Sequence, residues 1–85
     1  MNWVLIIDKA VKKQLQKIPK KDREKIIATI NEFVINPYTG DMEKMEGEKD
    51  VWRRRVGSYR IFYEILNNKN IIYVFEVRRR TSTTY

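Results

Sequence analysis

The 85-residue sequence contains neither cysteine nor histidine. Without these residues the protein cannot form a disulfide, a zinc site of the usual ligands, a thiol nucleophile or an imidazole general base. The longest early apolar run, Trp3 to Ile7, is too short for a signal peptide or a membrane span. We therefore expect a soluble, unprocessed, cytoplasmic protein whose chemistry uses other side chains, with no metal and no cofactor.

Length and composition predict one small folded domain over residues 1–85. A chain this short has material for a single hydrophobic core, which excludes two-domain enzymes. Its 42% hydrophobic fraction is too high for a disordered chain.

The positive charge is concentrated in the C-terminal third of the chain. The net charge is +7, but residues 1–50 contain ten basic side chains against nine acidic ones. Residues 51–85 contain eight basic side chains, seven of them arginine, and only Glu64 and Glu76 as acids. The planar guanidinium group binds phosphate oxygens bidentately and stacks on bases. The distribution predicts a polyanionic partner; the alternative is that the arginines only keep the surface soluble.

Hydrophobic periodicity predicts a strand and then two helices. Residues 2–7 are apolar and branched, as in a short strand, and Asp8 is placed to cap a helix over residues 9–18. Asp22 is a candidate cap for a second helix, which Asn36-Pro37 ends. The apolar positions expected on the second helix are Ile26, Ile27, Ile30, Phe33 and Val34.

The rest of the chain predicts a surface loop followed by three strands. Residues 38–50 contain two glycines and mixed charges, which are typical of a loop. Strands are expected at residues 51–56, 59–66 and 71–77, separated by short turns. The result is an α+β domain of order β-α-α-β-β-β, in which the last three strands form an antiparallel meander and the helices pack on one face of the small sheet.

Turn lengths predict which side chains share a sheet face. If the first turn has two residues, Arg55 lies opposite Arg60. The second turn then places Arg60 opposite Val77, whose face Arg79 shares. Like charges directly opposite one another destabilise a sheet, so this pairing indicates a site. Four arginines should converge at one end of this face: Arg53, Arg55, Arg60 and Arg79.

The remaining strand residues divide between the two faces. The opposite face should meet the helices and carries Trp52, Val56, Tyr59, Ile61, Tyr63, Ile65, Ile72 and Val74. Arg54 and Glu76 are expected to point away from the arginines. Phe62, Tyr73 and Phe75 are expected on the arginine face, where they either stack bases or fill a minor core.

Two segments resemble the RelE/ParE superfamily of toxins of type II toxin–antitoxin systems, and specifically its RelE branch of ribosome-dependent mRNA interferases. The stronger is "NPYTGDMEKMEGEKDVWRRRVGSYRIFYEI", which is similar to the family's loop, strand, short turn and following strand. The second, "VFEVRRRTSTTY", is similar to its last strand with basic residues and a tyrosine. The resemblance covers nearly the whole chain and implies a RelE-like fold.

The resemblance also implies an activity, a site and partners. The activity is metal-independent mRNA cleavage in the ribosomal A site, by attack of a ribose 2′-hydroxyl on the adjacent phosphate. The implied partners are a cognate antitoxin, the ribosome and mRNA, with operator DNA bound only through the antitoxin complex and no membrane. The positions matching the branch's catalytic residues are Arg53, Arg55, Arg60, Arg79 and Tyr85, and further phosphate contacts are expected from Arg54, Arg78 and Arg80.

Proton transfer is the open step in this chemistry. Arginine stays protonated, so Arg55 is a poor base. Glu64 lies about 13 Å along the strand from Arg60. Tyr85 is the best remaining candidate, with ring stacking or a frayed terminus as alternatives. Two other functions stay open: DNA gyrase inhibition, as in the ParE branch, and RNA binding without catalysis.

Overall fold

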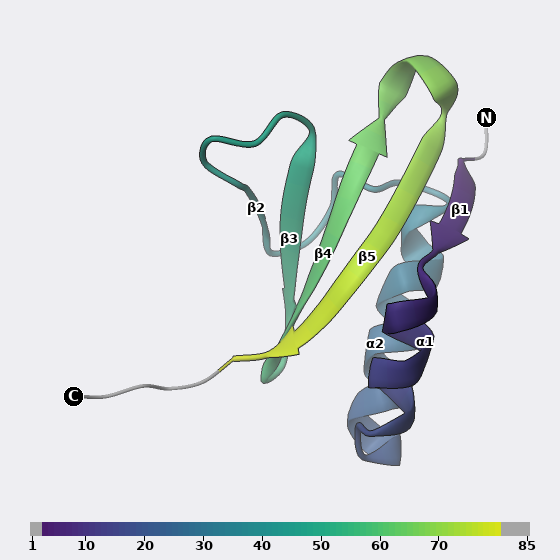
Figure 1. The fold of residues 1–85 in the computed structure, drawn as a ribbon, viewed down its shortest axis with the longest axis vertical. Helices are drawn as coiled ribbons and strands as arrows, with labels where there is room; N and C mark the ends of the chain where they lie inside the picture. Colours follow the sequence, from purple (N-terminus) through teal and green to yellow (C-terminus); the bar gives the residue numbers. More distant parts are fainter. Residues whose placement is uncertain (1–2, 81–85) are drawn as a thin grey trace.

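The computed structural model describes residues 3–80, in which two helices pack against one face of a five-stranded sheet (Figure 1). In chain order the elements are β1 (Val4–Ile7), α1 (Lys9–Gln16), α2 (Lys20–Phe33), β2 (Met42–Lys44), β3 (Val51–Val56), β4 (Tyr59–Leu66), a short 3-10 turn (Asn67–Lys69) and β5 (Ile71–Arg79). The strand order is β1-β5-β4-β3-β2, with β1 parallel to β5 and the other pairs antiparallel. The predicted α+β order is confirmed. Neither helix of this part of the chain is long and apolar enough to cross a membrane.

The two helices begin in different ways. Asp8 caps α1 as predicted, because its Oδ1 accepts a hydrogen bond from the Ala10 N–H at 2.8 Å. The prediction that Asp22 caps the second helix is wrong. Pro19 occupies the cap position of α2, and Asp22 lies in the first turn. Its negative charge is still favourable there, close to the positive end of the helix dipole.

The core lies between the helices and the inner face of the sheet, which is the face that meets them. It contains Val11, Ile18, Ile26, Ile30 and Phe33 from the helical layer, and Tyr59, Ile61, Tyr63, Ile65, Ile72, Val74 and Val77 from the strands. The Phe33 and Tyr63 rings stack with centroids 4.3 Å apart. Burial raises the pKa of Tyr63 to about 12, so its hydroxyl stays protonated and donates to the Pro37 carbonyl. Ile27 was expected in this core but is 41% exposed, because it lies off the row that Ile26 and Ile30 form.

The hairpin of β3 and β4 has the predicted register. Arg55 pairs with Arg60, and Arg53 pairs with Phe62, around the two-residue turn. The expected surface loop, however, contains the strand β2, which pairs with β3 at the edge of the sheet. This strand has only three residues, too few for alternation to distinguish it from a loop.

A β-bulge changes the register of the second hairpin. Near the turn the pairing follows the prediction, but Tyr63 pairs with Val74 while Phe62 pairs with Glu76. Phe75 is the extra residue, and beyond a bulge every side chain moves to the other face. Arg60 therefore pairs with Arg78 and not with Val77. The prediction that Glu76 points away from the arginine face is wrong for the same reason.

Candidate functional site

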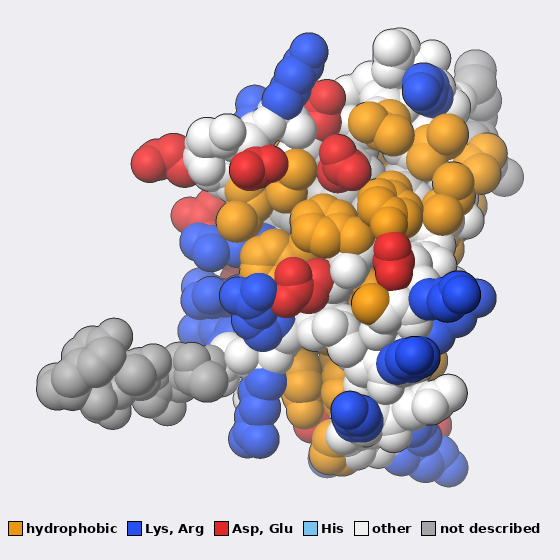
Figure 2. Space-filling model, in the orientation of Figure 1, with side chains coloured by type: hydrophobic (Ala, Val, Ile, Leu, Met, Phe, Trp, Pro, Cys, Tyr) orange, Lys and Arg blue, Asp and Glu red, His pale blue; other side chains and the backbone are white. Residues whose placement is uncertain are grey.

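Three arginines form a row across the outer face of the sheet, opposite the helices. Arg55 of β3 pairs with Arg60 of β4, which in turn pairs with Arg78 of β5. Directly opposed residues have Cβ atoms about 4.5–5.5 Å apart, so these side chains start close together. Arg53 lies two residues along β3 and shares their face. We call these four residues the arginine cluster; Figure 2 shows Lys and Arg side chains gathered on this part of the outer face.

Two carboxylates from the β2 segment lie against the arginine cluster. Arg53 Nε donates a hydrogen bond to Glu43 Oε1 at 2.8 Å, and Arg55 Nε lies 3.6 Å from Asp41 Oδ2. A hollow of about 10 Å³ lies between these side chains and is lined by Asp41, Glu43, Arg53, Arg55 and Arg60. The hydrogen bond from Arg53 lowers the pKa of Glu43, and the positive charges of Arg53, Arg55 and Arg60 add to that effect. Glu43 is therefore ionised at neutral pH.

The sequence contained a signal for these carboxylates that the loop prediction overlooked. Asp41 and Glu43 flank Met42, which packs against the core, so charged and apolar residues alternate with the period of a strand. Within residues 3–80, no group of three or more acidic side chains is placed to hold a metal ion. The neighbours of Asp41 and Glu43 are arginines, which suits binding of an anion and not of a cation.

Arg78 is held by other residues of the outer face. Its Nε donates to Glu76 Oε2 at 2.9 Å, and its guanidinium carbon lies 5.5 Å from the centre of the Phe62 ring. Phe62, Phe75 and Tyr73 lie on this face as predicted and form a row of rings, with centroids 6.4 and 6.1 Å apart. The buried Phe62 is only 7% exposed. This favours a packing role for the aromatic row over stacking on a base.

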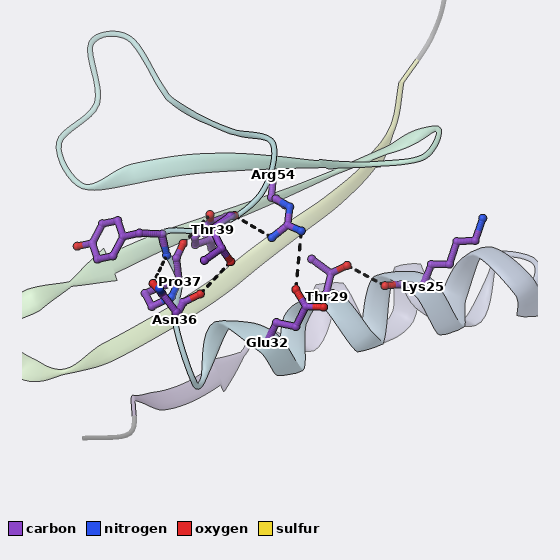
Figure 3. Close-up of polar contacts among 9 residues, drawn as sticks. Lys25, Thr29, Glu32, Asn36, Pro37, Thr39 and Arg54 are labelled. Carbon is purple, nitrogen blue, oxygen red and sulfur yellow. Dashed lines mark hydrogen bonds and ion pairs between the residues drawn. The ribbon is translucent and has the colours of Figure 1, made fainter.

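Arg54 lies on the inner face, as the alternation predicts. Its Nη1 donates to the Thr39 carbonyl at 3.0 Å, and its Nη2 lies 3.8 Å from Glu32 Oε1 on α2 (Figure 3). Only 14% of its side chain is exposed. A Cβ at Gly40, whose φ is +80°, would overlap this guanidinium group. Arg54 therefore connects β3 to α2 and the loop, and it lies outside the arginine cluster.

The three arginines at the end of β5 point in different directions. Arg79 pairs with Tyr59 and lies on the inner face, so its predicted place in the arginine cluster is wrong and Arg78 occupies that place. Arg80 bends back over the β3–β4 turn, where its N–H donates to the Ser58 carbonyl at 2.6 Å and its Nη1 lies 3.4 Å from the Gly57 carbonyl. Tyr85 lies outside the described residues.

Solved structures place this architecture among small toxin proteins. A chain of the archaeal RelE–RelB complex from Pyrococcus horikoshii superposes with a TM-score of 0.84 and 26% identity, covering 98% of this chain and all of that one. The isolated RelE toxin of E. coli has the same fold, with a TM-score of 0.81 and 20% identity over 95% of this chain and 87% of that one. The class of structure defined by these superpositions is the RelE fold.

Sequence comparison gives the family. The model for the ParE toxin of type II toxin–antitoxin systems, parDE, matches residues 5–83. A protein of Methanocaldococcus jannaschii assigned as toxin RelE1 is 29% identical over 83 residues, covering 94% of this chain and 92% of that protein. The chain therefore belongs to the RelE/ParE family of toxins of type II toxin–antitoxin systems.

Proposed function

We propose that this toxin is an endoribonuclease that cuts mRNA in the ribosomal A site and thereby inhibits translation. The observation that carries the proposal is the row of Arg55, Arg60 and Arg78 on three adjacent strands. Placing like charges opposite one another destabilises a sheet, so such a row is best explained by an anionic ligand. Guanidinium groups converging on one side also suit a phosphate better than separate surface charges do.

The proposed reaction is a transesterification within the RNA. The ribose 2′-oxygen attacks the adjacent phosphorus while the bond to the next nucleotide's 5′-oxygen breaks, leaving a 2′,3′-cyclic phosphate and a 5′-hydroxyl. One proton leaves the 2′-oxygen and one is given to the 5′-oxygen. The transition state carries additional negative charge on the phosphate, which the arginine cluster stabilises. In comparable oxyanion sites, loss of one preorganised donor costs about 10²- to 10³-fold in rate.

In this proposal Glu43 accepts the proton of the 2′-hydroxyl. It is an ionised carboxylate at the arginine cluster, whereas arginine side chains stay protonated. Its lowered pKa makes it a weak base, so the chemical step is expected to be slow. Tyr85 stays the predicted proton-transfer residue of the sequence, and in this proposal it gives a proton to the departing 5′-oxygen.

The partners in this proposal are the ribosome with its mRNA, and a cognate antitoxin. The P. horikoshii structure is a RelE–RelB complex, which supports an antitoxin partner for this chain. Operator DNA is contacted only through the toxin–antitoxin complex, no membrane is involved, and the toxin acts in the cytoplasm, where ribosomes are.

Inhibition of DNA gyrase is the second candidate function. It is favoured by the family model, which is named for the ParE toxin. A supercoiling assay with purified gyrase tests it. Inhibition of supercoiling without any mRNA cleavage would select this function over the first.

Mapping of mRNA 5′ ends by primer extension tests the proposed cleavage. The reaction contains programmed ribosomes with and without the toxin, and free mRNA serves as the control for ribosome dependence. We expect new 5′ ends at A-site codons only when both toxin and ribosomes are present. Intact mRNA on ribosomes that have bound the toxin would contradict the proposal.

A further inference from the structure

The arginine cluster is surrounded by almost as much negative charge as it carries positive charge. Three of its four arginines each contact a carboxylate, in the pairs Arg53–Glu43, Arg55–Asp41 and Arg78–Glu76. Within residues 3–80, Arg60 is the one member of the cluster that has no ion pair with an acid. Figure 2 shows acidic side chains beside the basic ones on this part of the outer face. Four positive charges are therefore opposed by three negative charges, and a ligand meets a net charge of only +1.

The bulge in β5 brings Glu76 to the outer face, opposite Phe62 on β4. The guanidinium group of Arg78 donates to Glu76 Oε2 from Nε at 2.9 Å and from Nη2 at 2.6 Å. Two of its N–H directions are therefore occupied, and the group is drawn back along β5 toward the Phe62 ring. A phosphate that binds Arg78 has to compete with Glu76 for these donors.

Asp41 is held beside Arg55 by the backbone. Its carbonyl accepts a hydrogen bond from the Arg55 N–H at 2.9 Å, and its Oδ2 lies 3.6 Å from Arg55 Nε. That second distance is too long for a hydrogen bond, so the two side chains interact through charge alone. The Asp41 side chain is 66% exposed, and an ion pair in such a position adds little to stability. Its charge therefore acts mainly on what approaches Arg55.

Acids placed beside arginines lower the affinity for every polyanion. A phosphate must break or share an ion pair before it reaches the guanidinium group, and the carboxylate also repels it. Repulsive elements of this kind provide selectivity, because they weaken unwanted complexes. Glu43 is the proton acceptor of the proposed reaction, whereas that reaction uses neither Asp41 nor Glu76. These two acids are therefore available for a role in choosing the ligand.

We propose that Asp41 and Glu76 determine the specificity of the arginine cluster by holding the toxin off free RNA. The inference rests on the RNA ligand of the proposed function. Free RNA must bring its phosphates to the cluster unaided, where two of the four arginines are already paired with these acids. A toxin seated on the ribosome meets the mRNA at a high effective concentration, which offsets the competition from the two carboxylates. Access to the cluster then depends on the ribosome.

Neutral substitutions of nearly the same size test this assignment. The affinity of the full-length toxin is measured by fluorescence anisotropy for a short labelled single-stranded RNA, whose 2′-hydroxyls are methylated so that it cannot be cut. Asp41→Asn and Glu76→Gln should each bind this RNA about two- to fivefold more tightly than the parent, which is the range expected for an exposed ion pair. Glu24→Gln makes the same change of net charge at an exposed position of α2, behind the sheet, and should have almost no effect.

The salt dependence of binding distinguishes loss of a charge from a change in structure. Each acid removed lets one arginine neutralise one further phosphate, so the slope of log K against log salt concentration should steepen by up to about 0.7 per acid. A rearrangement of the arginines would change the affinity without this increase.

Two results would overturn the proposal. One is that Asp41→Asn and Glu76→Gln bind RNA no more tightly than Glu24→Gln; weaker binding would mean that the acids position the arginines. The other is that neither the parent nor any variant binds the RNA. Because the RNA cannot be cut, this assay is independent of cleavage, and failure of the proposed function would appear separately in the primer-extension experiment.

Discussion

The outer and inner faces of the sheet consist of alternating residues of the same strands, yet the arginines of β3 differ in exposure and in partners between the two faces. On the inner face the single arginine of β3, Arg54, is largely buried and bound to the Thr39 carbonyl. On the outer face Arg53 and Arg55 are more exposed, and they contact the carboxylates of Glu43 in β2 and of Asp41 just before it. Strand β3 therefore uses its inner-face arginine to connect elements and keeps its outer-face arginines accessible to a ligand.

Neighbouring residues of one strand can therefore have unrelated roles. Substitution of a buried side chain of the inner face should cost stability and change function only through loss of folding. Substitution of an arginine of the arginine cluster should change RNA chemistry and leave folding nearly unaffected.

Phe33→Ala should produce the largest effect because it removes a fully buried ring from the inner-face core. Phe-to-Ala substitutions at such positions cost about 3–5 kcal/mol of unfolding free energy. For a domain of this size that is a large share of the total stability. Urea denaturation followed by circular dichroism measures the loss. A loss below about 1 kcal/mol would mean that the helices do not pack on the inner face as described.

Glu43→Gln should abolish most cleavage while leaving the fold intact. A general base contributes about 10²- to 10⁴-fold to rate, and the amide cannot accept the proton. The same substitution removes a negative charge that lies against the arginine cluster, so RNA binding should strengthen. Single-turnover cleavage on programmed ribosomes and binding of a short labelled RNA separate the two effects. Glu48→Gln, which removes the same charge outside the hollow of Glu43, is the matched control.

Arg60→Ala should reduce cleavage by about 10²- to 10³-fold, because it removes the central donor of the row. Its unfolding free energy should stay the same or rise slightly, since the like-charge contacts with Arg55 and Arg78 are relieved. Chemical denaturation and primer extension on the same preparation provide both values. Full cleavage by this variant would exclude Arg60 from the site. A large loss of stability would mean that Arg60 stabilises the fold and does not serve mainly to bind the ligand.

The sequence predicts β3 and β4 to the residue, because the two-residue turn and the strict alternation leave one register. The sequence also contains a signal for the bulge in β5, which the register prediction did not use. The apolar series Ile72 and Val74 would continue at Glu76, but it resumes at Val77, so one extra residue is needed to keep the acid out of the core. Because the bulge was not predicted, the sequence placed Arg79 in the site, whereas the structure places Arg78 there. The role of Tyr85 stays a prediction.

Arg54→Ala is the inner-face counterpart of the outer-face variants. It should lower the unfolding free energy by about 1 kcal/mol through loss of the hydrogen bond to the Thr39 carbonyl. The ion pair with the exposed Glu32 adds little. Cleavage should be retained once the protein is folded. Arg55→Ala, the next residue on the same strand, is the matched control and should show the reverse pattern: lost cleavage and unchanged stability. Equal losses of stability in the two variants would contradict the assignment of faces.

Asp8→Asn should have the smallest effect, a loss of stability that is present near neutral pH and disappears at acid pH. Hydrogen bonds from the Tyr73 hydroxyl and then from the Ala10 N–H lower the pKa of Asp8 below its usual 3.8. A carboxyl whose pKa is lower in the folded state than in the unfolded state stabilises the fold above the unfolded pKa, and this contribution is lost as pH falls through the folded pKa. The melting temperature of the parent should therefore exceed that of Asp8→Asn by a constant margin near neutral pH, and the margin should shrink below about pH 4. Thermal melts between neutral pH and about pH 3 measure it. A margin that persists unchanged at the lowest pH would mean that helix capping by Asp8 does not depend on its charge.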